Sequence, residues 1–461
     1  MSPFTVSVFT LLLGFGFYLL KTVFCFLYHE KLLITDLRTF RVYSIPIKHN
    51  AVQATEFRKI SPLGITASYW EHAAKGLVIL DPGFKNTAVK ESHITYIDGN
   101  RGILQYRQHP IGHLFAHHDY EDVVHLLVWG HLPTIEVKMK FRSQVAKFMV
   151  PDHSVLSVVQ SFNPDTPAYL VIAAGLSAWV ASHPNTIPVY RGDSIYQKDA
   201  NAVNDGVGRA IAAFTTVVAL TYCHQQGRPF DFKVDPALSS IENLLVMIGR
   251  VDHCGLPEKQ TALVLNKIWI LFADHEMTNS TAAFLNATSC LSDPMSALVA
   301  AVASANGPLH AGAIDLAYKG FEKMGNVSGV GRHMDDVRAK KCRLMGVGHR
   351  VYRTADPRIS YLRSIMGDLE ATTSQNRLLE VALEIDRIVA TDSYFTSRAL
   401  SINADLYSSF VYAALGFDQN IFTAFSMTAR CAGLLAHWRE GIGGQPCLWR
   451  PRQIFTGEVT S

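Results

Sequence analysis

Apolar residues recur along most of this chain at intervals of three and four positions, the spacing that places them on one face of an α-helix. The clearest windows span residues 123–130, 378–385 and 406–416. The last window ends at Gly416, a residue type that commonly follows the final turn of a helix. From residue 43 onward the chain has no low-complexity linker, long Pro/Ser run or repeat. The pattern therefore predicts a mainly α protein.

Strand patterns are few. Residues 77–80 form a short apolar run, and residues 94–97 form a second one, which Asp98-Gly99 follows. An Asp-Gly dipeptide after such a run indicates a β-hairpin turn. We therefore expect a small N-terminal β element at residues 77–107, and we interpret residues 29–42 as a short connector.

The N-terminal segment, residues 1–28, differs from the rest of the chain. The run from Phe4 to Leu20 carries no charge, and after Lys21 the apolar run resumes and continues to Tyr28. A bilayer span takes ~20 mostly apolar residues, and a lysine near the interface can extend its ammonium group to water. We therefore expect residues 4–28 to be a membrane anchor. A cleaved targeting peptide, a hydrophobic pro-segment and an artefact of the gene model are the alternatives.

The basic residues near this segment predict its orientation. Lys31, Arg38 and Arg41 follow the segment, whereas nothing basic precedes Lys21. By the positive-inside rule, the rest of the chain then faces the cytosol. If the segment is removed or does not belong to the protein, we expect a mitochondrial or cytosolic location.

Composition excludes several classes of function. The 461 residues are 48% hydrophobic and 18% charged, with a formal net charge of +3. This is enough apolar material for a large core, and the small net charge without a basic run gives no reason to expect a nucleic-acid partner. The seven cysteines are scattered and include no CxxC pair, which argues against a disulfide framework and against a cysteine-based zinc site.

Short catalytic signatures are mostly missing. The chain has no GxxxxGK phosphate loop and no HExxH or GxSxG motif. Gly346-Val347-Gly348 lacks the third glycine of a dinucleotide loop, so a nucleotide-dependent reductase is a weak alternative. His117-His118-Asp119 contains metal-ligand residue types, but adjacent helical residues diverge by about 100°. We expect a solvated helix start there and no metal.

The candidate catalytic and binding residues lie in three segments that contain a histidine and in one that contains an aspartate. His275 lies in Ala-Asp-His-Glu, His310 in Gly-Pro-Leu-His-Ala-Gly, and His349 in Gly-Val-Gly-His-Arg-Val-Tyr, with Arg358 after it in Asp-Pro-Arg. Asp405 lies in Asn-Ala-Asp-Leu-Tyr. Each alone has an ordinary explanation, such as a hydrogen-bonded turn histidine or a helix N-cap aspartate. Small neighbours around His310 and His349 favour a ligand site, because they let a ligand approach the backbone closely.

Four longer segments together resemble the citrate synthase family. They are DPGFKNTAVKESHITYIDGNRGILQYRQHPI at 81–111, MGVGHRVYRTADPR at 345–358, TARCAGLLAHWRE at 428–440 and RPRQIFTG at 450–457. The resemblance extends over about residues 43–457, in the order of the family. It implies a mainly α-helical, two-domain fold, with a large domain at residues 43–311 and 417–457 and a small domain at residues 312–416.

The resemblance also implies catalytic roles. Asp405 matches the base that removes a proton from the carbon beside an acyl-CoA thioester. His310 matches the donor that stabilises the oxygen of the resulting enol, and His349 matches the group that polarises the ketone of oxaloacetate and protonates the new alkoxide. Closure of the small domain onto the large one would exclude water from this reaction.

Substrate binding is implied in the same way. Guanidinium groups suit the two carboxylates of oxaloacetate, and the matching residues are Arg358 and Arg430, with His275 beside them. Arg450 matches an arginine that the other subunit supplies, so we expect a homodimer. No cofactor is implied, since acyl-CoA is a substrate. The residues that match the CoA-binding loop, with a basic residue nearby, are Leu344, Gly346, Val347, Gly348 and Arg353.

Three residues near these groups depart from the family pattern. Phe272 replaces a histidine, Ala311 replaces a glycine and Ile314 replaces an asparagine. Each change is larger in side chain or more apolar, so we expect an acyl-CoA longer than acetyl-CoA and an alkylcitrate product of specialised metabolism. Acetyl-CoA citrate synthase and 2-methylcitrate synthase share the same catalytic residues and are the alternatives. A catalytically inactive, membrane-bound interaction protein is the alternative of a different class.

Overall fold

The computed structural model describes residues 30–61 and 76–458. The chain divides into two compact units, one of residues 1–91 with 452–461 and one of residues 92–451. The segment predicted as a membrane anchor, residues 4–28, lies outside the described residues. The domain boundaries predicted at residues 311–312 and 416–417 fall within the second unit and stay a prediction.

The first unit contains a three-stranded antiparallel sheet of β1 (Lys31–Asp36), β2 (Arg41–Lys48) and β3 (Ala51–Val52), followed by the 3-10 helix η1 (Ala54–Lys59). In the β1–β2 hairpin, the carboxylate of Asp36 accepts hydrogen bonds from the backbone and the guanidinium of Arg38, which closes the turn. The prediction of a connector at residues 29–42 was therefore wrong. The prediction failed because β1 is short and its partner β2 extends beyond residue 42, outside the predicted connector.

Residues 77–80, which the apolar run predicts to be a strand, pair with no other strand in the described part of the chain. Their side chains are exposed, from 40% at Leu77 to 68% at Leu80. The backbone N–H of Leu77 donates one hydrogen bond to the carbonyl of Ile60 (3.1 Å). A run with strand propensity forms a ladder only against a neighbouring edge, so this prediction was wrong.

The second unit begins with β4 (Thr95–Asp98), β5 (Ile103–Tyr106) and β6 (His109–Pro110), which pair antiparallel in that order. This confirms the hairpin predicted after residues 94–97, with residues 99–102 as its loop. A Cβ atom on Gly99 would lie 2.1 Å from the carbonyl oxygen of Val351, and the N–H of Arg353 donates to the carbonyl of Gly99 (2.8 Å). The hairpin loop therefore packs directly on residues 351–353.

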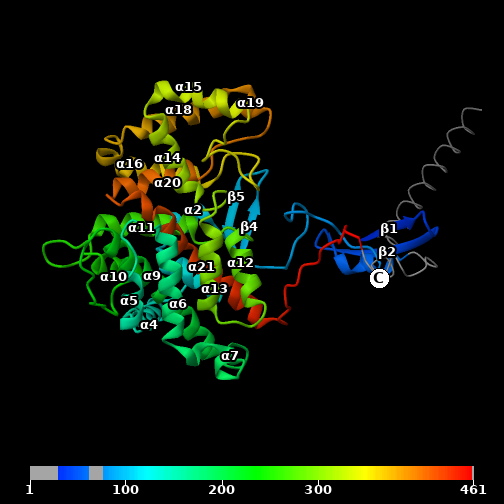
Figure 1. Cartoon of the computed structure of the whole chain (residues 1–461), viewed down its shortest axis with the longest axis horizontal. Coiled ribbons are helices and arrows are strands. Elements are labelled where there is room, and N and C mark those ends of the chain that lie inside the picture. Colours follow the sequence, from blue (N-terminus) through cyan, green and yellow to red (C-terminus); the bar gives the residue numbers. More distant parts are fainter. Residues whose placement is uncertain (1–29, 62–75, 459–461) are drawn as a thin grey trace, which may run out of the picture. The chain divides into compact units, whose positions relative to one another are not determined.

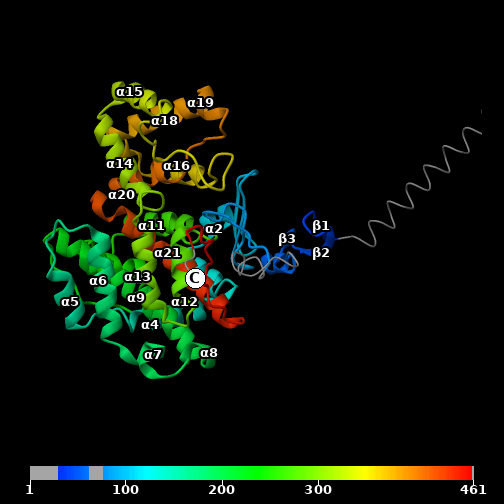
Figure 2. The ribbon, with the colours of Figure 1, turned by 45° about the vertical axis from the view of Figure 1, so that its right-hand side comes forward.

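The rest of the second unit is helical, which confirms the predicted mainly α fold (Figure 1, Figure 2). The first half contains α2 (Ile111–His117), α3 (Tyr120–Trp129), α4 (Ile135–Ala146), α5 (His153–Gln160), α6 (Ala168–Ala181), η3 (Pro184–Thr186), α7 (Pro188–Arg191), α8 (Ile195–Lys198), α9 (Ala200–Gln225), α10 (Ser240–Met247) and α11 (Lys259–Phe272). The second half contains α12 (Asn279–Thr288), α13 (Pro294–Ala305), α14 (Ala313–Met324), α15 (Val327–Arg338), α16 (Arg358–Asp368), α17 (Glu370–Thr373), α18 (Leu378–Thr391), α19 (Ser393–Thr396), α20 (Asp405–Ala414), η4 (Gln419–Ile421) and α21 (Phe422–Gly443).

Two long helices, α9 and α21, form the centre of this unit. They pack against each other, and α9 also packs against α6 and α10. The helix α9 is long and apolar enough to cross a bilayer, but 94% of its apolar window is buried inside the unit. Its composition is therefore accounted for by its position in the core.

The helical windows predicted from the apolar spacing are confirmed, because they lie in α3, α18 and α20. Gly416 follows α20 with a φ of +77°, the left-handed conformation expected of a residue after a helix. His117 ends α2, and Asp119 caps α3 by accepting a hydrogen bond from the N–H of Asp122 (3.0 Å). The segment His117–Asp119 thus contains a helix start.

Candidate active site

Most of the predicted catalytic and oxaloacetate-binding residues lie at helix ends or in the loops between helices of the second unit, whereas Arg430 lies within α21. His275 follows α11, His310 lies in the turn between α13 and α14, and His349 lies in the loop before α16. Arg358 is the first residue of α16, and Asp405 is the first residue of α20. Helix ends leave backbone groups unpaired, so side chains and ligands can bind them there.

His275, His349 and Tyr352 form one cluster. The ring centroids of the two histidines are 5.2 Å apart, and the Tyr352 ring lies 4.6 Å from the His349 ring. Nε2 of His275 is 3.0 Å from Oη of Tyr352. Burial, with Arg358 nearby, holds the pKa of His275 well below its usual value, so this imidazole is neutral. Sequence reasoning missed Tyr352, although it lies three residues after His349 in a matched segment.

His349 has a defined tautomer. Its Nδ1 accepts hydrogen bonds from the backbone N–H groups of Val351 (3.0 Å) and Tyr352 (3.1 Å). Burial and the charge of Arg358 lower the pKa of His349 to about 4, so the ring is neutral at physiological pH. A neutral imidazole that accepts at Nδ1 carries its proton on Nε2. His349 can therefore donate a hydrogen bond from Nε2.

His310 has the opposite tautomer. Its Nε2 accepts a hydrogen bond from the backbone N–H of Ser280 (3.2 Å), in the first turn of α12, and lies 2.7 Å from Oγ of Ser280. Burial and the charge of Arg430 lower the pKa of His310 to about 4. The proton of this neutral ring therefore lies on Nδ1. Sequence reasoning did not identify Ser280, because the contact joins residues 30 positions apart.

Asp356 holds Arg358 in a bidentate ion pair. The guanidinium Nε donates to Oδ1 (3.0 Å) and Nη2 donates to Oδ2 (2.6 Å), and both residues are buried. Burial lowers the pKa of Arg358, but the carboxylate of Asp356 outweighs burial and raises it. Oδ2 of Asp356 also accepts the backbone N–H of Ala404 (3.1 Å), next to Asp405. The ion pair thus connects the start of α16 to the start of α20.

Arg430 is buried in the middle of α21. Its Nε donates to the carbonyl oxygen of Phe272, the last residue of α11 (2.8 Å). Burial lowers the pKa of Arg430 and Arg358 acts in the same direction, whereas Asp274 raises it. Arg358 lowers the pKa of Arg430, so the two buried guanidinium groups concentrate positive charge in one place, which suits a dicarboxylate ligand.

Asp405 is suited to act as a base near neutral pH. Burial raises its pKa to about 7, Asp356 acts in the same direction, and Arg358 and Arg430 oppose it. The residue does not cap α20, because Ala404 occupies the N-cap position and no side-chain cap bond is present. A carboxyl with a pKa near 7 can accept a proton at physiological pH with more driving force than an ordinary aspartate.

Asn403 connects Asp405 to the loop at residues 344–348. Its backbone N–H donates to the carbonyl of Gly346 (2.9 Å), and its Nδ2 donates to the carbonyl of Gly348 (2.7 Å). Its Oδ1 accepts the backbone N–H of Asp405 (2.9 Å). Both glycines have a φ near +80°. In the same loop Leu344 is buried, and Val347 forms an antiparallel bridge with Ile402.

Asp274 anchors the segment that carries His275. It is fully buried, and its Oδ2 accepts hydrogen bonds from Oγ1 of Thr95 (2.5 Å) and Nε2 of His437 (3.4 Å). Burial raises the pKa of Asp274, but His437, Arg430 and Thr95 together outweigh burial, and the net change is downward. A Cβ atom on Gly433 of α21 would lie 2.1 Å from Oδ1 of Asp274. Only a glycine on α21 permits this approach.

Two predicted contacts are not part of this cluster. Arg353 and Arg450 are both exposed, and within the described residues no hydrogen bond or ion pair connects either side chain to the cluster. Their roles in binding CoA and in completing a partner's site stay predictions. Of the departures from the family pattern, Ile314 is buried in α14, and the carbonyl of Ala311 accepts a hydrogen bond from Oγ1 of Thr423 (3.2 Å).

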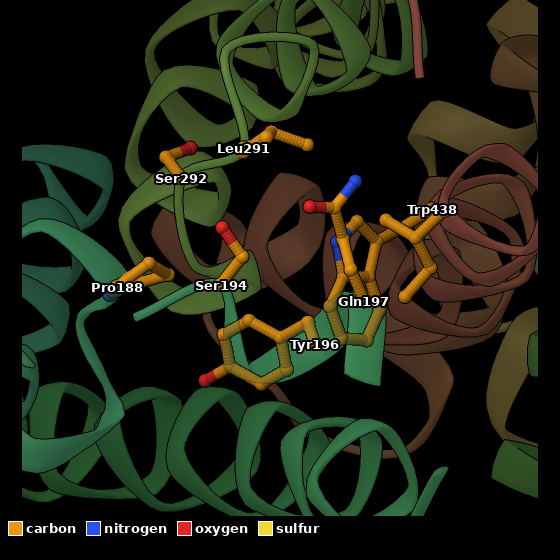
Figure 3. A pocket seen from close by; sticks show the side chains of 8 residues that line it. Pro188, Ser194, Tyr196, Gln197, Leu291, Ser292 and Trp438 are labelled. Carbon is orange, nitrogen blue, oxygen red and sulfur yellow. The ribbon is translucent and has the colours of Figure 1, made fainter. Parts of the chain in front are cut away.

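Other features of the second unit lie apart from these residues. A small pocket, drawn in Figure 3, is bordered by Tyr196 and Trp438, whose rings lie 5.2 Å apart. Over the described part of the chain, potential metal ligands converge at the exposed Asp252, His253 and Cys254, with their ligand atoms within 4.8 Å of one another. Neither place contains a predicted site residue.

The chain matches known proteins over most of its length. Residues 83–452 match the sequence model of the citrate synthase C-terminal domain. The chain is 42% identical over 431 residues to the citrate synthase-like protein oryE of Aspergillus oryzae, covering 93% of this chain and 96% of that protein. It is 35% identical over 430 residues to the alkylcitrate synthase phiJ of a fungal species, covering 93% of each.

A solved structure shows the same fold. The citrate synthase of the archaeon Thermoplasma acidophilum, in a ternary complex with carboxymethyl coenzyme A and oxaloacetate, superposes with a TM-score of 0.76 at 28% identity. The match covers 83% of this chain and 97% of that one. The sequence and the fold lead to the same conclusion, that this chain belongs to the citrate synthase family of condensing enzymes.

Proposed function

We propose that this chain condenses an acyl-CoA with oxaloacetate and that its preferred acyl group is longer than acetyl, so that the product is an alkylcitrate. The observation that carries the condensation is the geometry of the site, in which backbone N–H groups hold the rings of His310 and His349 and Asp356 holds Arg358. Arg358 and Arg430 both lie close enough to shift the pKa of His275 and Asp405. Neutral hydrogen-bond donors, a carboxyl with a pKa of about 7 and buried guanidinium groups are what the reaction requires.

The proposed reaction uses each group once. Asp405 removes a proton from the carbon beside the thioester, while Nδ1–H of His310 donates to the thioester oxygen as negative charge develops there. That carbon then forms a bond with the ketone carbon of oxaloacetate. Nε2–H of His349 polarises the ketone and protonates the new alkoxide. Water finally hydrolyses the thioester and releases CoA with its free thiol.

The longer acyl group is supported by relatives and by sequence. The relatives phiJ and tstJ, from a fungal species and from Talaromyces stipitatus, are alkylcitrate synthases at 35% and 34% identity. Ala311, beside the catalytic His310, and Ile314 add apolar carbon where the family has glycine and asparagine. Each methylene that an apolar site buries stabilises binding by up to ~0.8 kcal/mol, so a few carbons are enough to set a preference.

A panel of acyl-CoA substrates tests this proposal. The purified enzyme is given oxaloacetate with acetyl-, propionyl-, hexanoyl- or decanoyl-CoA, and release of the CoA thiol is measured. We expect the highest kcat/KM with hexanoyl- or decanoyl-CoA. A preference for acetyl- or propionyl-CoA would make the chain a citrate or 2-methylcitrate synthase. No thiol release with any of the four would contradict the condensation itself.

The proposed dimeric site has its own test. If Arg450 acts in the partner's site, a mixed dimer of Arg450→Ala and Asp405→Ala subunits contains one site with both native residues. Co-expression of the two inactive variants should then restore thiol release. If Arg450 acts within its own subunit, every site in the mixed dimer has a defect and activity stays absent.

We also propose that residues 4–28 tether the chain to a membrane with the enzyme facing the cytosol. The uncharged run and the basic residues that follow it support this proposal. The full-length chain should sediment with membranes, whereas a chain that begins at Lys31 should not. Resistance of the second unit to added protease in sealed vesicles would contradict the cytosolic orientation.

A further inference from the structure

Phe272 is the residue that contacts both guanidinium groups of the proposed oxaloacetate site. It ends α11, three residues before His275, and only 5% of its surface is exposed. Its carbonyl accepts the hydrogen bond from Arg430 (2.8 Å), and its ring lies under Arg358, with 5.2 Å between Cζ of Arg358 and the ring centroid. The backbone of this residue therefore contacts one arginine and its side chain contacts the other.

The backbone contact does not depend on the type of side chain. The last carbonyl groups of a helix have no partner within the helix and carry its partial negative charge. The carbonyl of Phe272 is one of these groups, and Arg430 satisfies it. Any residue at position 272 that preserves the end of α11 can hold Arg430 in this way.

The ring contact does depend on the side chain. Asp356 already uses Nε and Nη2 of Arg358, so its carboxylate fixes one edge of the guanidinium. The face of the Phe272 ring attracts the cation and fixes the tilt of the guanidinium plane about that edge. Nη1 is thereby left in a defined direction for a ligand carboxylate. Histidine, the residue that the family resemblance implies here, becomes cationic on protonation and would then repel both arginines.

We infer that Phe272 is a positioning residue for the dicarboxylate substrate, aligning Arg358 through its ring, and that this departure from the family pattern acts on oxaloacetate binding and not on the choice of acyl chain. The inference rests on the proposed condensation and deepens it. It also separates Phe272 from Ala311 and Ile314, which stay candidates for acyl selectivity.

Replacement by leucine tests the inference. Phe272→Leu keeps an apolar side chain and the backbone carbonyl but removes the aromatic face. Binding of oxaloacetate by the full-length enzyme is measured by calorimetry, and KM is measured separately for oxaloacetate and for each acyl-CoA. We expect the Kd of oxaloacetate to rise about 5- to 30-fold, as for loss of a desolvated cation–π contact, with the acyl-chain profile unchanged. Phe272→Tyr, which keeps the aromatic face, should restore binding.

A matched control exists in the same unit. The guanidinium of Arg209 lies over the ring of Phe148, with 4.3 Å to the centroid, and neither residue is a predicted site residue. Phe148→Leu loses a ring and a cation–π contact too, and should leave the Kd of oxaloacetate within twofold. If Phe272→Leu does not fold, Phe272→Met serves in its place.

The outcomes distinguish this inference from the proposed function. Failure of the native enzyme to bind oxaloacetate would contradict the proposed function. If the native enzyme binds oxaloacetate, an unchanged Kd in Phe272→Leu, or a shift in its acyl-chain profile, would overturn the inference alone.

Discussion

Gly433 lies where α21 packs against the segment that carries His275, and replacing it with alanine perturbs this close approach. The new Cβ would lie 2.1 Å from Oδ1 of Asp274 and 2.7 Å from the carbonyl oxygen of Ala273. Ordinary contact begins at about 3.4 Å, so the two segments must separate by more than 1 Å. Asp274 is fully buried and hydrogen-bonded to Thr95, so it cannot turn aside.

The expected magnitude follows from two opposing effects. Alanine within a helix is favoured over glycine by about 1 kcal/mol. Overpacking of a rigid interior costs about 1–3 kcal/mol, and the upper part of this range applies because the contacted atoms are a carbonyl and a short buried carboxylate. We expect a net loss of about 1–2 kcal/mol of stability. Displacement of His275 by about 1 Å should lower kcat/KM by about 10²-fold.

Thermal unfolding and thiol release with oxaloacetate and the preferred acyl-CoA measure both effects. The control is Gly441→Ala on the same helix, where a Cβ atom meets nothing within 4 Å. That variant should keep native activity and unfold at the native temperature or slightly above it. If Gly433→Ala behaves in the same way as Gly441→Ala, the close approach of α21 to Asp274 does not constrain the site and the reasoning is refuted.

Other predictions concern charge and tautomer. Asp405→Asn should lower thiol release by about 10²- to 10⁴-fold. In the native enzyme, kcat/KM for acyl-CoA should rise as pH increases through about 7, because the base must be ionised. A flat profile from pH 6 to 8 would contradict the assignment of the base. Stability should change in the opposite direction. Because folding raises the pKa of Asp405, the folded chain holds an extra proton between about pH 4 and 7. The stability that comes from the protonated carboxyl is therefore lost as pH rises through about 7. Asp405→Asn should therefore raise the unfolding temperature at pH 8 and leave it unchanged at pH 4. Ser280→Ala removes the Oγ contact to His310 but keeps the backbone N–H, so kcat should fall about 3- to 10-fold with no change in the Kd of oxaloacetate; an equal rise in Kd would indicate a structural effect. Asp356→Ala leaves the buried Arg358 unpaired and should cost about 3–5 kcal/mol of stability, measured by denaturant unfolding, whereas a loss below 1 kcal/mol would show that solvent reaches the pair.

The sequence predicted those helices and turns that depend on residues close to one another in the chain. The helices α3, α18 and α20 follow from the spacing of apolar residues, and the β4–β5 hairpin follows from Asp98-Gly99. The strand prediction at residues 77–80 failed and the β1–β2 hairpin was missed for one reason. A ladder needs two strands. A single run of residues reveals neither that residues 77–80 have no pairing strand among the described residues nor that β1 pairs with β2.

The candidate site was predictable to the extent that its residues lie in recognisable segments. His310, His349 and Asp405 could be named in this way, but their protonation could not. The tautomer of His310 depends on Ser280, and the raised pKa of Asp405 depends on burial and on charges from other helices. Phe272 was identified as unusual but was assigned to acyl selectivity, because the sequence does not reveal that its ring lies under an arginine from another helix.

The bonds of Asn403 have a consequence for redesign of the acyl-CoA specificity. The backbone N–H and the side chain of Asn403 bind two carbonyl groups of the 344–348 loop. The same side chain binds the first N–H of the helix that begins with Asp405. Both carbonyls belong to glycines in the left-handed region, so this connection depends on backbone shape. Libraries that vary chain-length preference should therefore leave Gly346, Gly348 and Asn403 unchanged and place diversity elsewhere, since a change that reshapes this loop also displaces the base.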